Sequence, residues 1–128
     1  MPSRTPTILI IDNDDGLVAA LRVRLESMGY RCRGASTGAQ GIAAFLEHDV
    51  DLVISDLNMP GGDGVGLARN VRARSDVPII IITGFRDEFR RELRAIPRVT
   101  TLQKPFAFEA LRDLVEAELL VSGQSLPV

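Results

Sequence analysis

The chain has 128 residues, of which 45% are hydrophobic, and its formal net charge is -2. This length fits one domain with a sizeable core, and the apolar content argues against a disordered chain. The small net charge gives no electrostatic footprint for direct nucleic-acid binding, and the longest apolar run, residues 78–82, is too short to cross a membrane. Since the chain opens without an export leader and has one cysteine, we expect a cytoplasmic protein without an internal disulfide.

Short apolar runs alternate with segments in which apolar residues recur at helical spacing. Apolar runs at residues 7–11, 52–55 and 78–82 are typical of buried strands, and we expect two further strands at residues 30–35 and 99–103. The helical spacing predicts helices at about 17–28, 37–47, 65–74, 87–96 and 108–121. This alternation predicts a doubly wound parallel sheet with helices on both faces. Residues 122–128 should form a flexible C-terminal tail.

Local features of the second strand and helix give further predictions. Ser36 or Thr37 should cap the helix at its start. Its buried face should carry Ala39, Ile42, Ala43 and Leu46. Cys32 should face the core, as lone cysteines usually do. His48 should lie at the surface and bind no metal, because no second His or Cys lies at metal-ligand spacing.

Polar residues follow the ends of four of the expected strands. These residues are Asp12, Asn13, Asp56, Thr83 and the only lysine of the chain, Lys104. The carboxyl ends of parallel strands share one edge of the sheet, so these side chains can converge. Carboxylate and carbonyl oxygens suit Mg2+, while a hydroxyl and an ammonium can hold a phosphoryl group. Because aspartate can accept phosphate covalently, the sequence predicts a Mg2+ and phosphate pocket centred on Asp56.

The motifs that carry these residues resemble those of a known family. They read IIDNDD after the first strand, SDLNMPGGDG around Asp56, IITG after the fourth strand and QKPF after the fifth. Their order and spacing resemble the response-regulator receiver domain of bacterial two-component signalling, and the receiver domain would span residues 1–121. The resemblance implies a flavodoxin-like five-stranded parallel sheet with strand order 2-1-3-4-5 and five helices.

The resemblance also implies a role for each residue of the pocket. Asp56 would be the phosphoacceptor, and Asp12 and the backbone carbonyl of Asn58 would help to bind Mg2+. Thr83 would donate a hydrogen bond to a phosphoryl oxygen, and Lys104 would pair with that phosphoryl group. The donor would be a sensor histidine kinase or a histidine phosphotransfer protein. The domain would be a signalling receiver and not an enzyme in the ordinary sense, apart from its own phosphorylation and dephosphorylation.

The resemblance further implies a cis peptide between Lys104 and Pro105, which is plausible for an X-Pro bond in a tight turn. It also implies that the signal leaves through the outer face formed by the fourth helix, the fifth strand and the fifth helix. No output domain is visible in the sequence, so the effector stays open.

Two positions depart from the family pattern. Asn13 occupies the place of a second acid that commonly touches the metal, so we expect weaker Mg2+ binding, with partial rescue by Asp14. The alternative is that Asn13 is tolerated with little effect. Thr101 occupies a position at which many receivers carry an aromatic switch residue. It is either an ordinary strand residue or the mark of a receiver that passes phosphate on and needs little conformational readout.

Three other classes of protein share parts of this pattern. A degenerate receiver could bind a protein partner without being phosphorylated, and Asn13 and Thr101 both favour it. A haloacid-dehalogenase-like phosphatase would use Asp12 as nucleophile, but this chain lacks the late acid pair of those enzymes. An EF-hand fails on context, because a helix should precede the acidic loop.

Overall fold

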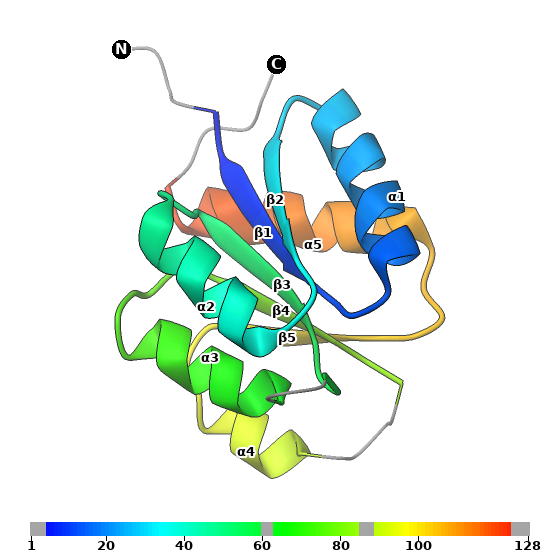
Figure 1. Ribbon diagram of the computed structural model, residues 1–128. Helices are drawn as coiled ribbons and strands as arrows, with labels where there is room; N and C mark the ends of the chain where they lie inside the picture. Colours follow the sequence, from blue (N-terminus) through cyan, green and yellow to red (C-terminus); the bar gives the residue numbers. More distant parts are fainter. Residues whose placement is uncertain (1–4, 60–62, 85–88, 124–128) are drawn as a thin grey trace.

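A five-stranded parallel sheet lies between two layers of helices in the computed structural model, which describes residues 5–59, 63–84 and 89–123 (Figure 1). The strands are β1 (Thr7–Ile11), β2 (Arg31–Ala35), β3 (Leu52–Asp56), β4 (Ile79–Thr83) and β5 (Val99–Gln103). The helices are α1 (Asp15–Ser27), α2 (Gly38–Glu47), α3 (Gly64–Arg72), α4 (Arg90–Arg94) and α5 (Phe108–Val121). The strand order is β2-β1-β3-β4-β5, and each neighbouring pair is parallel. The predicted fold class and strand order are confirmed.

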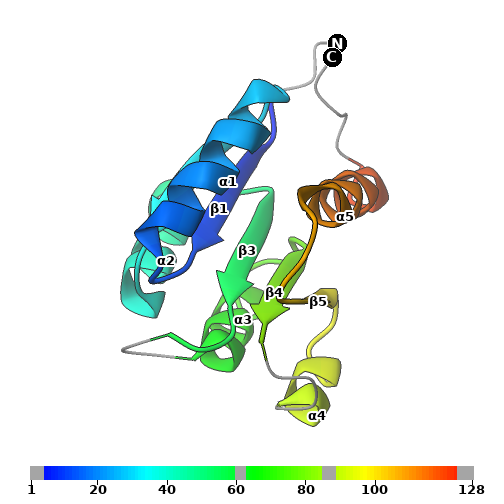
Figure 2. The ribbon, with the colours of Figure 1, turned by 90° about the vertical axis from the view of Figure 1, so that its right-hand side faces the viewer.

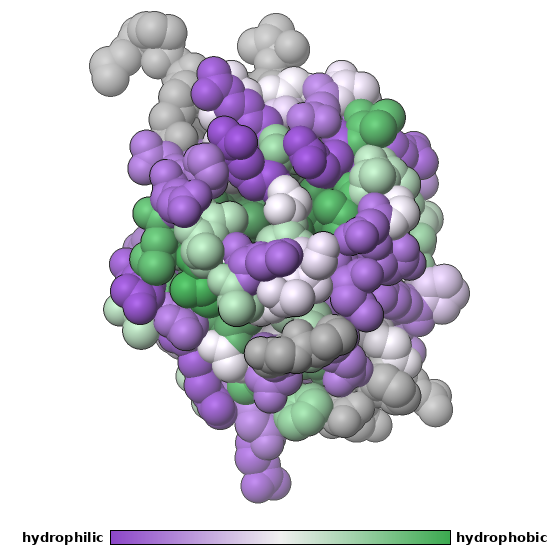
Figure 3. All heavy atoms as spheres, in the orientation of Figure 1, coloured by the Kyte–Doolittle hydropathy of each residue, from purple (hydrophilic) through white to green (hydrophobic). Residues whose placement is uncertain are grey.

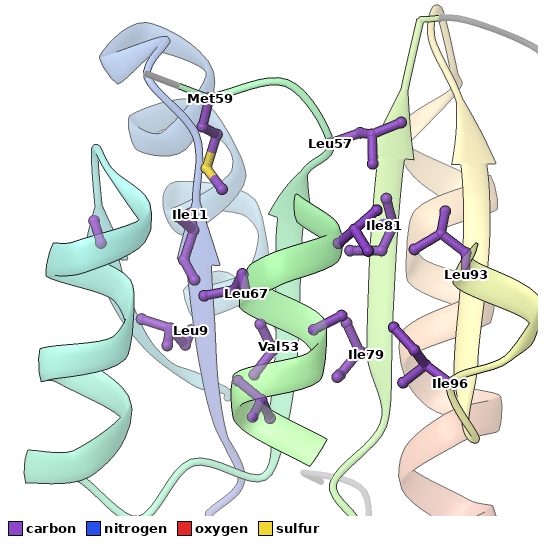
Figure 4. Close-up of a cluster of buried hydrophobic side chains, with 14 of the residues drawn as sticks. Leu9, Ile11, Val53, Leu57, Met59, Leu67, Ile79, Ile81, Leu93 and Ile96 are labelled. Atoms are coloured by element: carbon purple, nitrogen blue, oxygen red, sulfur yellow. The ribbon is translucent and has the colours of Figure 1, made fainter. Parts of the chain in front are cut away.

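The two faces of the sheet bury alternate residues of the same strands. Ile8, Ile10, Ile80 and Ile82 pack with α1 and α5, whereas Leu9, Ile11, Ile79 and Ile81 pack with α2, α3 and α4. Figure 2 shows α2 and α5 on opposite sides of the strands, and Figure 4 shows side chains of the cluster that packs with α2, α3 and α4. Since β1, β3 and β4 are buried on both faces, they read as continuous apolar runs in the sequence.

Most element boundaries lie close to their expected positions. The expected ends of β1, β5 and α5 are those of the structure. The first helix starts earlier than expected, at Asp15, because the side chain of Asp14 accepts the N–H of Leu17 at 3.1 Å and so caps the helix. The fourth helix is shorter than expected, with Arg90–Arg94 as its described part; residues 87 and 88 lie outside the described residues.

The second helix is capped as expected but turned differently. Thr37 is the N-cap, and its hydroxyl accepts the N–H of Gln40 at 3.1 Å. The residues fully buried on α2 are two glycines, Gly38 and Gly41. A Cβ on Gly41 would lie 2.5 Å from Cδ1 of Ile11, so the helix approaches β1 closely at Gly41.

The predicted apolar face of α2 was therefore wrong at most positions. Ile42 is partly buried against the core, but Ala39 and Ala43 are exposed and Leu46 is 58% exposed. Glycine carries no hydrophobic signal, so a pattern of apolar side chains could not identify the face that packs.

Other local predictions can be compared with the structure directly. Cys32 is buried, as expected. His48 follows α2 as its C-cap and is partly buried. Of the described helices, none is long and apolar enough to cross a membrane. On the face seen in Figure 3, hydrophilic and apolar side chains are interspersed.

Candidate functional site

The candidate site lies at the carboxyl edge of the sheet, where the chain leaves successive parallel strands. Asp56 and Thr83 are the last residues of β3 and β4, while Asp12 and Lys104 directly follow β1 and β5. Two hydrogen bonds extend the ladder past the strand ends: Asp12 N–H donates to Ala35 O at 3.0 Å, and Lys104 N–H donates to Thr83 O at 2.8 Å. The backbone positions of the site are thus set by the sheet itself.

One ammonium group bridges the two carboxylates of the site. Nζ of Lys104 lies 3.5 Å from Oδ2 of Asp12 and 3.6 Å from Oδ1 of Asp56. Asp12 is 3% exposed and Asp56 is 8% exposed, so both carboxylates are largely removed from water. These distances are those of an ion pair and exceed those of a strong hydrogen bond. The lysine therefore offsets part of the negative charge without saturating either carboxylate.

The two oxygens of Asp12 have different surroundings. Oδ1 accepts the N–H of Asp14 at 2.9 Å, which fixes the orientation of the carboxylate. Oδ2 is buried and, within the part of the chain that the structure describes, has no hydrogen-bond partner. A buried anionic oxygen without a donor is costly unless a cation balances it. The donor set thus fits a small, hard cation such as Mg2+ between Asp12 and Asp56.

Burial raises the pKa of Asp56, and the nearby carboxylate of Asp12 raises it further. The ammonium of Lys104 and the backbone N–H groups of Asn58 and Leu57 act in the opposite direction. The net direction is upward, so the site binds a proton more readily than an exposed aspartate does. A second cation in the pocket would favour the charged form of Asp56.

The remaining predicted site residues differ in exposure. Thr83 is 7% exposed and lies on the strand next to β3, so its backbone flanks the site. Asn13 and Asn58 are exposed loop residues next to Asp12 and Asp56 in the sequence. Among residues 5–59, 63–84 and 89–123, no group of three or more His, Cys, Asp or Glu side chains could hold a metal ion. Two carboxylates are therefore the acidic part of the site, and further ligands would have to be neutral oxygens.

Asp14, which we expected to compensate for Asn13, has another contact. Its carboxylate caps α1 by accepting the N–H of Leu17. A contribution of Asp14 to metal binding would therefore compete with the cap of this helix.

A mostly apolar groove of about 650 Å3 adjoins the site between α1 and the start of α5. It is lined by Leu17, Ala20, Leu21, Arg24, Lys104, Pro105, Phe106 and Phe108. The peptide between Lys104 and Pro105 is cis, as the resemblance implies. The guanidinium carbon of Arg24 lies 4.1 Å from the centre of the Phe108 ring, which joins the two walls of the groove. This groove could not be predicted from the sequence, because its walls are distant in sequence and carry no shared motif.

The topology and the acidic strand ends define an α/β protein with a site at the carboxyl edge of a parallel sheet. Residues 8–116 match the model of the response regulator receiver domain. The chain belongs to this family. Receiver domains act in two-component signalling, in which response regulators interact with sensor kinases, and they generally bind Mg2+; they are signalling domains rather than classical enzymes.

Known proteins similar to this chain include regulators that are longer than the part they share with it. A probable transcriptional regulator, ycf27 of Cyanidium caldarium, is 36% identical over 88% of this chain and 45% of its own length. The regulatory protein VanRB of Enterococcus faecalis is 32% identical over 91% of this chain and 53% of its own. This chain therefore spans about half the length of these relatives.

Solved structures extend the similarity to the fold. The chemotaxis response regulator CheY4 of Vibrio cholerae has a TM-score of 0.83 at 27% identity, over 91% of this chain and all of its own. A two-component response regulator from Clostridium difficile has a TM-score of 0.85 at 27% identity, over 90% and 96% of the two chains.

Proposed function

We propose that this chain accepts a phosphoryl group on Asp56 from a phosphohistidine, in a Mg2+-dependent reaction in the cytoplasm. The observation that carries the proposal is the pairing of two buried carboxylates around one ammonium, with no hydrogen-bond donor to Oδ2 of Asp12 in the part of the chain that the structure describes. Mg2+ would be held by Asp12 and Asp56, with the backbone carbonyl of Asn58 and the side-chain amide of Asn13 as neutral ligands. When bound, the ion would neutralise charge on the transferring phosphoryl oxygens.

The side chains divide the work of the transfer. A carboxylate oxygen of Asp56 forms the new bond to phosphorus while the phosphorus–nitrogen bond of the donor breaks. The electron pair of that bond returns to the imidazole of the donor. Asp56 then no longer carries a free carboxylate, so the ammonium of Lys104 can pair with a phosphoryl oxygen instead. Thr83, at the end of β4, would donate its hydroxyl to another phosphoryl oxygen.

Asn13 weakens the metal site in this scheme. Its amide can supply an oxygen but no charge, so two carboxylates hold the ion where three acids are usual in the family. We therefore propose a receiver with lower Mg2+ affinity than is typical.

The apolar groove next to Lys104 supports a protein donor. A phosphohistidine on a helix or loop must approach Asp56 from solvent, and apolar walls beside the acceptor give that partner a surface to bury. We therefore propose that a sensor histidine kinase or a histidine phosphotransfer protein is the donor. The boundary of the receiver domain is proposed at residue 121, where α5 ends, with residues 122–128 as its tail.

The output of the receiver would be produced by residues or proteins outside this chain. The relatives named above are regulators about twice as long as the match, so an output region or a separate effector would read the receiver. We propose that it reads the face formed by α4, β5 and α5. Thr101, an exposed residue of β5, occupies the position at which many receivers carry an aromatic switch residue. The readout at this position would therefore not use an aromatic side chain.

The test is incubation with Mg2+ and a small acyl phosphate, followed by mass spectrometry of the intact protein and of its peptides. One phosphoryl group should appear on Asp56 in the native chain and none in Asp56→Asn. Asp63→Asn is the matched control, because Asp63 is an exposed acid after the same strand whose carboxylate caps α3.

Other outcomes of this experiment would favour the other candidates. Incorporation at Asp12 would favour a dehalogenase-like reaction. A chain that gains no phosphoryl group but captures a partner equally well with and without the donor would be a phosphorylation-independent binding module. The departures at Asn13 and Thr101 are the observations that favour this second function.

A further inference from the structure

Arg98 has an unusual backbone for an arginine. It precedes β5 directly, at the turn after α4, and its φ angle is 59°. The left-handed region is unfavourable for a residue with a Cβ, so such a conformation persists only where surrounding contacts hold it. The contacts of Arg98 identify what holds it.

The guanidinium of Arg98 bridges two separate parts of the chain. Nη1 donates to the backbone oxygen of Asp76, before β4, at 3.1 Å. Nη2 donates to Oγ of Ser122, the C-cap of α5, at 2.6 Å. The side chain thus ties the entry to β4 to the last turn of α5.

A second arginine holds the backbone of the same turn. Arg72, at the end of α3, donates from Nε to Pro97 O at 2.8 Å and from Nη2 to Arg98 O at 3.2 Å. The N–H of Ile79 donates to Arg98 O at 3.1 Å. Contacts from α3 and β4 therefore hold the backbone of the turn, and the side chain of Arg98 connects this turn to α5.

The end of α5 has two polar ties to the region of β5. Ser122 Oγ accepts from Arg98 and donates to Glu118 O at 3.0 Å, so its single proton is used within the helix. Thr100 donates its hydroxyl to Oε1 of Glu118 at 3.1 Å. Thr100 therefore points to α5, whereas its neighbour Thr101 is exposed. A displacement of β5 has a direct polar route to the end of α5 that does not involve Thr101.

We propose that Arg98 is a conformational latch, which holds the last turn of α5 against the turn before β5 and passes a shift of β5 to the end of that helix. Its mechanical part depends only on the contacts above. Its regulatory part rests on the proposed function, because phosphorylation of Asp56 is the event that would shift β5.

Amide hydrogen exchange of the unphosphorylated protein tests the mechanical part. The amides of Ser122 and Gly123, which donate to the last carbonyls of α5, should exchange about tenfold faster in Arg98→Gly than in the native chain. Glycine accepts the left-handed backbone, so this variant removes the side chain without adding strain. Ser122→Ala should show a smaller increase, and Arg112→Ala, which removes a partly exposed arginine of the same helix, should show none.

Two results would overturn the latch. One is native exchange at Ser122 and Gly123 in the Arg98→Gly protein. The other is an equal increase in α1 and α5, which would mean that Arg98 stabilises the whole domain and not the end of one helix.

The regulatory part is tested in samples in which mass spectrometry shows a phosphoryl group on Asp56. Phosphorylation should accelerate exchange at Ser122 and Gly123 in the native chain and add nothing in Arg98→Gly. Unchanged exchange in phosphorylated native protein would overturn the coupling while the acceptor role of Asp56 stands. Failure to phosphorylate Asp56 would appear in the mass spectrum first, and would contradict the proposed function separately.

Discussion

Buried carboxylates at the two ends of the parallel sheet differ in their hydrogen bonding. At the amino end, Asp51 is 4% exposed and its Oδ2 accepts the N–H of Thr7 at 2.8 Å, which joins β3 to the start of β1. At the carboxyl end, Asp12 is 3% exposed, yet no donor among the described residues reaches its Oδ2, which faces an ammonium that is shared with Asp56. Burial is nearly equal at the two positions, so exposure alone does not distinguish an acid paired within the fold from an acid of the candidate site.

The difference lies in how completely the polar groups are paired. At the amino end, backbone and side-chain partners hold Asp51, Arg72 and Arg98 in place. The carboxyl end has two carboxylates for one ammonium and, within the described ranges, a buried oxygen without a hydrogen-bond donor, which costs stability. A region that binds ions and phosphate is expected to be less than fully satisfied in their absence.

The largest expected effect is a difference in the free energy of unfolding between variants of Asp51 and of Asp12. Asp51→Ala should lower the free energy of unfolding by about 2 kcal/mol, because the N–H of Thr7 would be left buried without an acceptor. Asp12→Asn should leave the free energy of unfolding unchanged or higher in metal-free buffer, because it removes one of two like charges that share Lys104. Urea unfolding of both variants measures this. Equal losses would mean that both acids are structural.

The next effect concerns the groove beside the carboxyl end. Ala20→Glu places a charge on an exposed position of its wall and should slow phosphoryl transfer from a phosphohistidine protein about tenfold, while incorporation from a small acyl phosphate stays unchanged. Ala19→Glu is the control, because Ala19 is exposed on the same helix but outside this groove. Parallel time courses with the two donors measure the effect. Equal slowing with both donors would place the groove outside partner binding.

A smaller effect is expected for the position at which this chain departs from its family. Asn13→Asp should raise Mg2+ affinity severalfold, because it adds a negative charge beside the two existing carboxylates. Calorimetric titration of the native and variant proteins with Mg2+ measures the change in affinity. If the two affinities are equal, the amide of Asn13 is an adequate substitute and the proposed weakness of the metal site is wrong.

The smallest effect follows from the raised pKa of Asp56. An acid whose pKa is raised in the folded state binds its proton more strongly there than in the unfolded chain. Its contribution to the stability of the fold is therefore lost as the pH rises from the ordinary pKa, 3.8, through the raised pKa of the folded state. Asp56→Asn should therefore be slightly more stable than the native chain at neutral pH without metal, and the gain should vanish as the pH falls toward 3.8. The gain is small because Lys104 and two backbone N–H groups stabilise the carboxylate. Denaturant unfolding over this pH range measures it; a gain that grows at low pH would contradict the direction of the shift.

Much of the fold could be predicted because its information is local. An apolar run bounded by polar turn residues located β1 to the residue, and the run before Asp56 located the strand that carries it. The site followed from the same runs: once the strands are parallel, Asp12, Asp56 and Lys104 must emerge at one edge, and the structure places the three side chains within ion-pair distance. Which residues bind metal or phosphate stays a prediction.

The sequence by itself determined the alternation of strands and helices, the edge at which the acids gather and the lysine that joins them, because each depends on the order of residue types along one segment. Only the tertiary structure decided which face of α2 packs, since Gly41 is buried through closeness to Ile11 and not through hydrophobicity. It also decided that Arg98 connects β4 to α5 and that α1 and α5 enclose a groove. These contacts join residues far apart in the chain, so no local pattern encodes them.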